Sequence, residues 1–244
     1  MQISIVVPSY NEGHRIRATI DAIAAFCERE LTEWEVIIVD DGSSDATSAT
    51  AAAKDDRVKL LRNSSNSGKG FSVRRGILEA KYDPVLFTDA DLSTPIEESL
   101  LLLEAIRAGA DVAIGVRTPT GGRPVRRPLR RKLMALGFRL LVKALVLRGF
   151  HDTQNGFKMF RRDAARRIFS LQRLDRWGFD VEVLYLARRE GMKIAQVPVA
   201  YTESSESRLR LVTPLTMIRD LLQVRWNALV GKYSRGGIRA PRDP

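Results

Sequence analysis

Four aspartates stand directly after apolar, β-branched runs of the sequence. Asp40 and Asp41 follow one such run, and Asp89 and Asp91 follow another. Residues two apart on an extended chain point to the same side, so Asp89 and Asp91 could face one hard cation. Carboxylate oxygens are ligands for divalent cations such as Mg²⁺, and a cation held in this way neutralises a diphosphate. The spacing therefore predicts a metal site at Asp89 and Asp91 that binds a phosphate-containing substrate.

The first half of the chain alternates short β-branched runs with helical periodicity, which is typical of parallel strands joined by helices. Strands are predicted at residues 3–7, 35–39, 58–61, 85–88 and 111–116. Helices are predicted at residues 15–28, 45–54 and 69–80, and a further helix has Thr94 as its N-cap and Pro95 as its first residue. Ligands of open α/β sheets bind beyond the carboxyl ends of the strands, so both aspartate pairs are expected at one binding edge.

The second half of the chain has a different pattern. A loop is predicted at residues 118–128, helices at 129–147, 179–190 and 214–233, and a strand at 193–199. We therefore expect an α/β fold with a mainly parallel sheet flanked by helices and with amphipathic helices toward the C-terminus. Residues 1–233 are predicted to form a single domain, and residues 234–244 a disordered tail.

The chain is strongly basic. Forty Lys and Arg residues against 29 Asp and Glu residues give a formal net charge of +11, which attracts phosphates, anionic lipids or nucleic acids. The densest run of cations comprises Arg117, Arg123, Arg126, Arg127, Arg130, Arg131 and Lys132. This run lacks interleaved aromatic residues, and no recognition-helix signature is present, so a nucleic-acid-binding module is the remote alternative and no nucleic-acid partner is expected.

Cysteine usage and hydropathy bear on the compartment. Cys27 is the single cysteine, so it cannot form an intrachain disulfide, and we expect a buried thiol in a reducing compartment. No apolar run reaches the roughly 20 residues that a bilayer span needs, and the opening residues do not resemble a signal peptide. A cytoplasmic protein is therefore predicted.

A third motif joins the aspartate pairs. Val6-Val7-Pro8-Ser9-Tyr10-Asn11-Glu12, taken with those pairs, makes the chain resemble family-two glycosyltransferases of the GT-A fold, which is Rossmann-like. Residues 66–70, 151–160 and 176–182 are similar to the subgroup that builds dolichyl- or polyprenyl-phosphate sugars, above all the dolichyl-phosphate β-glucosyltransferases. The resemblance implies that residues 1–116 form the nucleotide-sugar half of the domain and residues 117–233 the acceptor half.

The resemblance also implies roles for individual residues. Pro8, Tyr10, Glu12 and Asp40 would hold the nucleoside, and Asp89 and Asp91 the metal, either Mg or Mn, and the diphosphate. The full set expected at the nucleotide sugar is Pro8, Tyr10, Glu12, Asp40, Asp41, Lys69, Asp89, Ala90, Asp91 and Arg208. The set expected at the acceptor phosphate is Arg117, Arg131 and Lys158. Ser205-Glu206-Ser207-Arg208 stands where the subgroup usually has a Gly-Ser-Lys-like element, so the chain departs from the subgroup at the loop that closes over the donor.

The implied reaction is the inverting transfer of a hexose from a nucleotide diphosphate sugar to a polyprenyl or dolichyl phosphate. The phosphate acceptor is already anionic and attacks without a base, so Asp89, Asp91 and Arg117 would suffice for catalysis. If the acceptor were instead a hydroxyl of a glycan or small glycoside, a general base would be needed, and the candidates are Asp152, Asp180 and Glu182. UDP-glucose is the favoured donor, with GDP-mannose second.

An isoprenoid acceptor requires contact with a membrane surface. Residues 129–149 combine apolar faces with a stripe of Lys and Arg, as does the final predicted helix. Helices of this kind can lie at a bilayer interface without crossing it. We therefore expect a peripheral protein at the cytoplasmic face of a membrane, and the final helix could instead pack on the sheet or form a homodimer.

Overall fold

A computed structural model describes residues 1–52, 55–119, 149–202 and 214–234 of the chain. The predicted helix at 129–147 and two predicted phosphate ligands, Arg131 and Arg208, lie outside the described residues. Within the described ranges, the helices are all too short or too polar to cross a membrane.

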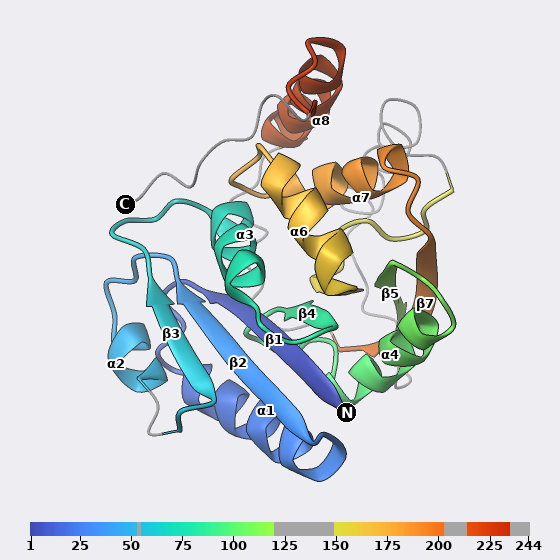
Figure 1. The fold of residues 1–244 in the computed structure, drawn as a ribbon. Coiled ribbons are helices and arrows are strands. Elements are labelled where there is room, and N and C mark those ends of the chain that lie inside the picture. The colour runs from blue at the N-terminus through green and yellow to red at the C-terminus, as the bar shows by residue number, and fades with distance from the viewer. Residues whose placement is uncertain (53–54, 120–148, 203–213, 235–244) are drawn as a thin grey trace.

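The core of the fold is one mainly parallel sheet (Figure 1). Its strands are β1 (Gln2–Ser9), β2 (Glu33–Asp40), β3 (Val58–Arg62), β4 (Val85–Thr88), β5 (Val112–Pro119), β6 (Phe157–Phe160) and β7 (Ile194–Tyr201). Their order across the sheet is β3-β2-β1-β4-β6-β5-β7. Only β6 among these described strands runs antiparallel to its neighbours, β4 and β5. The predicted α/β class with a mainly parallel sheet is confirmed.

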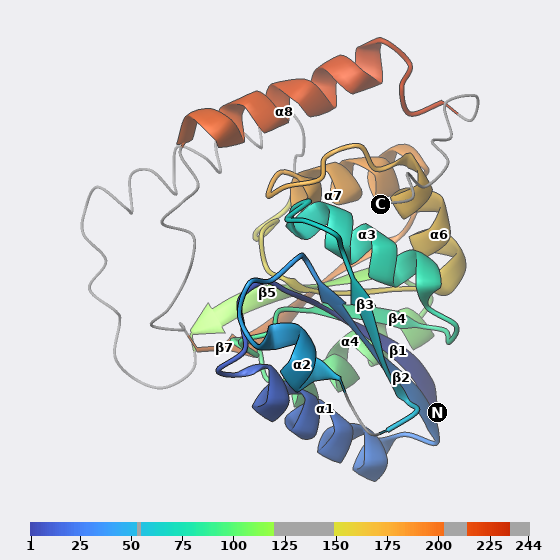
Figure 2. The same ribbon diagram turned by 90° about the vertical axis from the view of Figure 1, so that its left-hand side faces the viewer.

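Helices cover both faces of this sheet (Figure 2). One face packs against α1 (Ile16–Glu30), α2 (Thr47–Ala51) and α4 (Ser99–Arg107), which follows a 3₁₀ turn at Ile96–Glu98. The other face packs against α3 (Lys69–Glu79), α6 (Arg162–Leu171) and α7 (Phe179–Arg189). The last helix, α8 (Pro214–Leu229), lies across the outside of α7, so it adds a further layer on that side.

Alternation along the strands produces the two apolar cores. In β1, Ile5 and Val7 belong to the core beneath α1 and α4, whereas Val6 between them belongs to the core beneath α3. Gly76 lets α3 lie against the sheet, because a Cβ atom there would come within 2.4 Å of Val6 Cγ1. Cys27 is buried in the α1 core, as predicted, and burial raises the pKa of its thiol to about 12, so the thiol is unreactive.

Three predictions about elements need correction. β6 and α6 were not predicted. The helix predicted at residues 45–54 is helical in the described residues only at 47–51. Thr94 is not a helix N-cap: its buried hydroxyl has no hydrogen-bond partner among the described residues, and the chain first forms a 3₁₀ turn that begins at Ile96. The short β6 escaped notice because four residues do not establish a period, and Lys158 interrupts its apolar run.

Candidate active site

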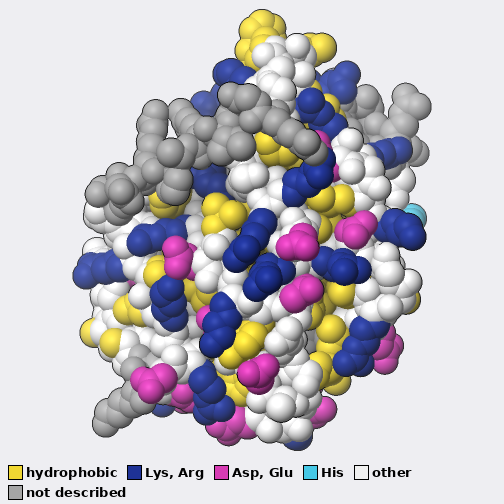
Figure 3. All heavy atoms as spheres, viewed as in Figure 1, with side chains coloured by type: hydrophobic (Ala, Val, Ile, Leu, Met, Phe, Trp, Pro, Cys, Tyr) yellow, Lys and Arg dark blue, Asp and Glu magenta, His cyan; other side chains and the backbone are white. Residues whose placement is uncertain are grey.

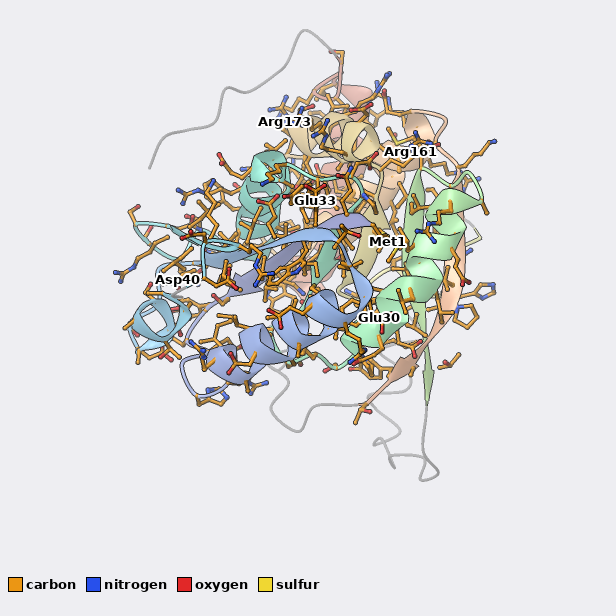
Figure 4. All side chains as sticks on the ribbon, turned by 60° about the horizontal axis from the view of Figure 1, so that its bottom comes forward. Met1, Glu30, Glu33, Asp40, Arg161 and Arg173 are labelled. Atoms are coloured by element: carbon orange, nitrogen blue, oxygen red, sulfur yellow. The ribbon has the colours of Figure 1, made fainter. Side chains whose placement is uncertain are left out.

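The aspartate pairs lie at the same edge of the sheet. β2 ends at Asp40, and β4 ends directly before Asp89, with β1 between the two strands. All three strands are parallel, so their carboxyl ends meet at this edge. Figure 4 labels Asp40 at this end of β2 and Glu33 at the opposite end. In an α/β sheet this edge is where ligands bind.

Asp40 is fully buried and organises the loop that follows β2. Its Oδ1 accepts a hydrogen bond of 3.0 Å from the backbone N–H of Ser43, and its two oxygens also accept short hydrogen bonds from the Ser43 and Ser48 hydroxyls. The Ser43 hydroxyl in turn accepts a 2.8 Å hydrogen bond from the backbone N–H of Asn11. Asp40 thus ties the loop after β2 to the segment after β1, and its direct contact with a nucleoside stays a prediction.

The end of β1 and the turn after it carry three of the predicted nucleoside ligands. Pro8 and Glu12 are partly buried and Tyr10 is exposed at the edge. Asn11 adopts a left-handed backbone with φ of 51°, which is uncommon outside glycine. Hydrogen bonds hold this turn, from Ser44 N–H to Asn11 Oδ1 at 2.9 Å and from Glu12 N–H to the Thr47 hydroxyl at 2.7 Å. Tyr10 and Glu12 therefore sit on a fixed turn and not on a loose loop.

Asp41 is buried and holds the loop that leads into α3. Its carboxylate accepts hydrogen bonds from Asn63 Nδ2 at 2.7 Å and from the backbone N–H groups of Ser67 at 2.9 Å and Gly68 at 2.8 Å. Gly68 has φ of +105°, and a Cβ atom there would come within 2.4 Å of a neighbouring backbone oxygen, so only glycine fits. The described contacts make Asp41 the residue that positions Lys69, the next in the chain.

Lys69 projects from the start of α3 to Asp89. Its Nζ lies 2.6 Å from Asp89 Oδ1 and 5.3 Å from the ring centroids of both Phe87 and Trp177. Desolvation acts to lower the pKa of Lys69, but the charges of Asp89 and Asp180 outweigh it and raise the pKa. Desolvation also raises the pKa of Asp89, against the opposing effect of Lys69. The pair therefore places a cation in contact with the first of the two predicted metal ligands.

The Asp89-Ala90-Asp91 segment forms a tight turn, which corrects the expectation of an extended chain. The Leu92 N–H donates to Asp89 O at 3.2 Å, and Leu92 has φ of 45°. Ala90 is buried, and its carbonyl accepts a 2.6 Å hydrogen bond from the Thr19 hydroxyl of α1. Both aspartate side chains remain partly exposed on this turn. Ala90 thus anchors the turn to α1, and the two carboxylates flank that anchor.

The backbone of Gly156 lies directly against the Asp89 carboxylate. A Cβ atom at this position would lie 2.1 Å from Asp89 Oδ2 and 2.4 Å from its Cγ. No side chain fits there without moving the carboxylate. In the sequence, Gly156 stands within the motif at residues 151–160. A glycine directly before a strand is the signal that could have indicated this close approach.

The two partly exposed carboxylates fit a divalent cation that is shared with a substrate. Among the residues that the structure describes, no cluster of three or more His, Cys, Asp or Glu side chains could hold a metal ion. Asp89 and Asp91 are instead a two-carboxylate set on one turn. Mg²⁺ is commonly bound by one or two carboxylates together with substrate phosphates. The donor set therefore suits a cation that arrives with a diphosphate.

Arg117 near the end of β5 forms a two-pronged ion pair. Its Nε lies 2.5 Å from Asp152 Oδ2 and its Nη2 lies 2.9 Å from Asp152 Oδ1. The guanidinium also lies 5.2 Å from the centroid of the Tyr201 ring. Burial acts to raise the pKa of Asp152, but the hydrogen bonds and charge of Arg117 outweigh it and lower the pKa. Asp152 is therefore a weak base that orients the guanidinium.

Lys158 and Asp180 form a buried pair. The Lys158 ammonium donates a short hydrogen bond to Asp180 and a 2.5 Å hydrogen bond to the carbonyl of Asn155. Both side chains are almost completely buried. Because the Lys158 side chain is buried in this pair, the arrangement does not support its predicted contact with an acceptor phosphate, which stays a prediction. Asp180 likewise neutralises Lys158, and its predicted role as a base is not supported.

Glu182 lies on the interior side of α7. It is fully buried and accepts hydrogen bonds from the backbone N–H groups of Arg173 at 3.0 Å and Leu174 at 2.8 Å and from the Tyr233 hydroxyl at 2.6 Å. Burial raises the pKa of Glu182 to about 7. The carboxylate faces the loop before α7 and Tyr233 beyond α8, so this arrangement does not support its predicted role as a base for a hydroxyl acceptor, which stays a prediction.

Comparisons with known proteins identify the family of the chain. The sequence profile of Glycosyl transferase family 2 matches residues 4–169. The human dolichyl-phosphate beta-glucosyltransferase is 36% identical over 95% of this chain and 77% of its own length. The enzyme of that name from Saccharomyces cerevisiae is 34% identical over 95% of this chain and 76% of its own length.

Solved structures show the same fold. Glucosyl-3-phosphoglycerate synthase from Mycobacterium tuberculosis, in complex with Mn²⁺, UDP-Glc and phosphoglyceric acid, has a TM-score of 0.70 at 22% identity over 91% of this chain and 79% of that one. Mannosyl-3-phosphoglycerate synthase from Rubrobacter xylanophilus has a TM-score of 0.69 at 21% identity over 100% of this chain and 79% of that one. The fold is that of GT-A glycosyltransferases, as predicted, and the chain belongs to glycosyl transferase family 2.

Proposed function

We propose that this protein transfers glucose, with inversion, from UDP-glucose to a polyprenyl or dolichyl phosphate. The curated relatives at 34–36% identity are named for this acceptor and this sugar. The observation that carries the choice of acceptor is the engagement of the three carboxylates that could serve as a base. Asp152 pairs with Arg117, Asp180 pairs with Lys158, and Glu182 is buried. A phosphate acceptor is anionic near neutral pH and needs no base.

The donor side of the reaction rests on Asp89, Asp91 and Lys69. Asp89 and Asp91 would hold a divalent cation, which when bound supplies positive charge to the leaving diphosphate. Lys69 is within 2.6 Å of Asp89 and so can contact a phosphate oxygen that approaches the same carboxylates. Pro8 at the end of β1 and Tyr10 and Glu12 in the turn after it would contact the nucleoside. These residues orient the anomeric carbon for attack from the acceptor side.

The acceptor side rests on Arg117. Asp152 holds its guanidinium in a fixed plane, and the remaining donors of the fork can bind phosphate oxygens. Fixing the attacking phosphate next to the donor lowers the entropic part of the barrier. In-line attack by a phosphate oxygen then inverts the α-linked sugar to a β-linked product, and the leaving group is the nucleoside diphosphate.

A hydroxyl acceptor is the second candidate for the same site. It would require a carboxylate with a pKa near the working pH within hydrogen-bond reach of the hydroxyl. The lowered pKa of Asp152 and the ion pair of Asp180 count against these two residues. This alternative would be favoured only if a glycan or small glycoside were glycosylated faster than a prenyl phosphate.

The donor and the cation are proposed from the ligands bound to a protein of the same fold. A fold neighbour was solved with Mn²⁺ and UDP-Glc, so UDP-glucose with Mn²⁺ or Mg²⁺ is the first combination to test and GDP-mannose the second. A lipid-phosphate acceptor also implies that the protein works as a peripheral protein at the cytoplasmic face of a membrane.

The test compares acceptors under one condition. Labelled UDP-glucose and Mn²⁺ or Mg²⁺ are incubated with the protein and a short polyprenyl phosphate, the matching polyprenol, or an alkyl glycoside. We expect an acid-labile glycolipid only with the polyprenyl phosphate, and no product in excess chelator. Transfer to the alkyl glycoside without a lipid product would overturn the proposal.

A further inference from the structure

The last described helix, α8, has two faces of opposite character. Leu221, Val224 and Asn227 are buried against the domain. On the other side, Leu222 is 52% exposed, Trp226 58% and Leu229 76%, and Val230, just past the helix, is 45% exposed. Leu222, Trp226 and Leu229 follow one another at steps of four and three residues, and Val230 lies four residues after Trp226. The four residues therefore form one stripe along the helix, which we call the outer stripe.

Cations surround the outer stripe. Arg219, which is 77% exposed, lies one turn before Leu222, and the exposed Arg225 lies beside Leu222 and Leu229. Lys232 is exposed just beyond the stripe. Figure 3 shows hydrophobic side chains over α8 at the top of the molecule with Lys and Arg side chains beside them. An apolar stripe bordered by long cationic side chains suits a surface that is apolar inside and anionic outside.

The inner side of α8 contacts the turn before α7, which lies next to the candidate active site. A Cβ atom on Gly178, at the start of α7, would come within 2.5 Å of Asp220 Cβ, so α8 lies in direct contact with that turn. Trp177, the preceding residue, has its ring centroid 5.3 Å from Lys69 Nζ. A helix with its side chains is roughly 10–12 Å thick. The outer stripe therefore lies about one helix thickness from the turn that contacts Lys69.

We propose that the outer stripe docks on an anionic bilayer surface and sets the site at the height of a lipid phosphate. This deepens the proposed function, which needs a membrane-bound acceptor, and names the surface that reaches it. A second copy of the chain fits the stripe less well, because two stripes bordered by Arg219 and Arg225 would bring like charges together. Four side chains are also few for a stable dimer, which buries roughly 800 Å² on each partner.

The test measures binding to vesicles in the absence of donor and acceptor. The full chain is sedimented with vesicles of phosphatidylcholine alone or with phosphatidylserine added. We expect binding to the mixed vesicles that weakens at high salt and falls about tenfold or more in the double variant Leu222→Ser, Leu229→Ser. The matched control is Leu101→Ser, because Leu101 is 40% exposed on α4, on the opposite side of the sheet.

Trp226 offers an independent readout. Trp34 is buried and Trp177 is partly buried, so Trp226 is the most exposed of the three tryptophans. Lipids brominated in the acyl chain should quench the fluorescence of the wild-type protein, and Trp226→Phe should remove most of that quenching while sedimentation is retained. Quenching that is unchanged in Trp226→Phe would contradict insertion of this side chain.

Two outcomes would overturn the inference. One is equal vesicle binding by the wild type and the double variant. The other is a concentration-dependent dimer that the double variant abolishes while its vesicle binding is unchanged, which would assign the stripe to a second copy. Transfer to a water-soluble, short-chain prenyl phosphate is measured in parallel and should be the same in the double variant and the wild type. Loss of that transfer in the wild type would count against the proposed function and not against the docking surface.

Discussion

Gly156 lies directly against Asp89, the first of the two proposed metal ligands. The substitution Gly156→Ala adds a Cβ atom that would lie 2.1 Å from Asp89 Oδ2, 2.4 Å from its Cγ and 2.6 Å from Oδ1. An ordinary contact of a Cβ atom begins at 3.4 Å, so Oδ2 and Cγ of Asp89 must retreat by about 1 Å or more. Lys69, 2.6 Å from the same carboxylate, must move with it.

The expected effect is large on turnover and moderate on stability. Misplacing a catalytic group by about 1 Å can slow a reaction roughly 100-fold, and we expect a loss of this size in kcat for Gly156→Ala. Overpacking of this kind costs about 1–3 kcal/mol in the free energy of unfolding. The assays are steady-state transfer over a range of Mn²⁺ concentrations and urea unfolding monitored by circular dichroism.

A double-mutant cycle tests whether the effect passes through Asp89. In the variant Asp89→Gly the carboxylate is gone, so Gly156→Ala should no longer reduce the free energy of unfolding. Unchanged turnover in Gly156→Ala would refute the placement of Asp89 in catalysis. A stability cost of the same size with and without Asp89 would refute the steric reasoning.

Further predictions concern Asp91, Arg117 and Glu182. Asp91→Asn should lower transfer about 100-fold or more with little change in melting temperature, because its described contact is a single hydrogen bond from Ser93 N–H; an unaltered rate would remove Asp91 from the metal site. Arg117→Lys should lower kcat strongly with little change in melting temperature, since lysine cannot bind a phosphate through two parallel N–H groups. A large fall in melting temperature with little change in kcat would make Arg117 structural. Burial raises the pKa of Glu182 from 4.5 to about 7, so the protonated form is favoured in the folded state. The stability that this supplies is complete below about pH 4 and is lost as pH rises through 7, by on the order of 3 kcal/mol. Urea titrations at several pH values should show that Glu182→Gln lacks this component, and an identical pH dependence would disprove the assignment.

The sequence indicated the edge of the sheet at which the site lies. The apolar runs before Asp40 and Asp89 are strands, and parallel pairing brings their carboxyl ends together. The pattern could do this because strand direction and order in α/β folds follow from the alternation of strands and helices. It could not indicate the geometry of the turn after β4, which depends on the Thr19 contact and on the left-handed backbone of Leu92.

Residues from distant parts of the chain were harder to assign. Lys158 was predicted as a phosphate ligand, and its ion pair was not foreseen. Its partner, Asp180, lies on a helix that only the fold brings alongside β6. Glu182 was predicted as a candidate base, whereas its burial depends on the loop at Arg173 and on Tyr233. Ion pairs and burial of this kind arise from tertiary packing, and local spacing carries no information about them.

The anomeric configuration and linkage of the product test the proposed inverting transfer to a lipid phosphate most directly. The protein is incubated with ¹³C-labelled UDP-glucose, Mn²⁺ and a short polyprenyl phosphate, and the lipid product is analysed by NMR. Single inverting attack by a phosphate oxygen predicts a β-linked glucosyl phosphate whose anomeric carbon is coupled to phosphorus. An α-linked product, or glucose attached to a hydroxyl without coupling to phosphorus, would contradict it.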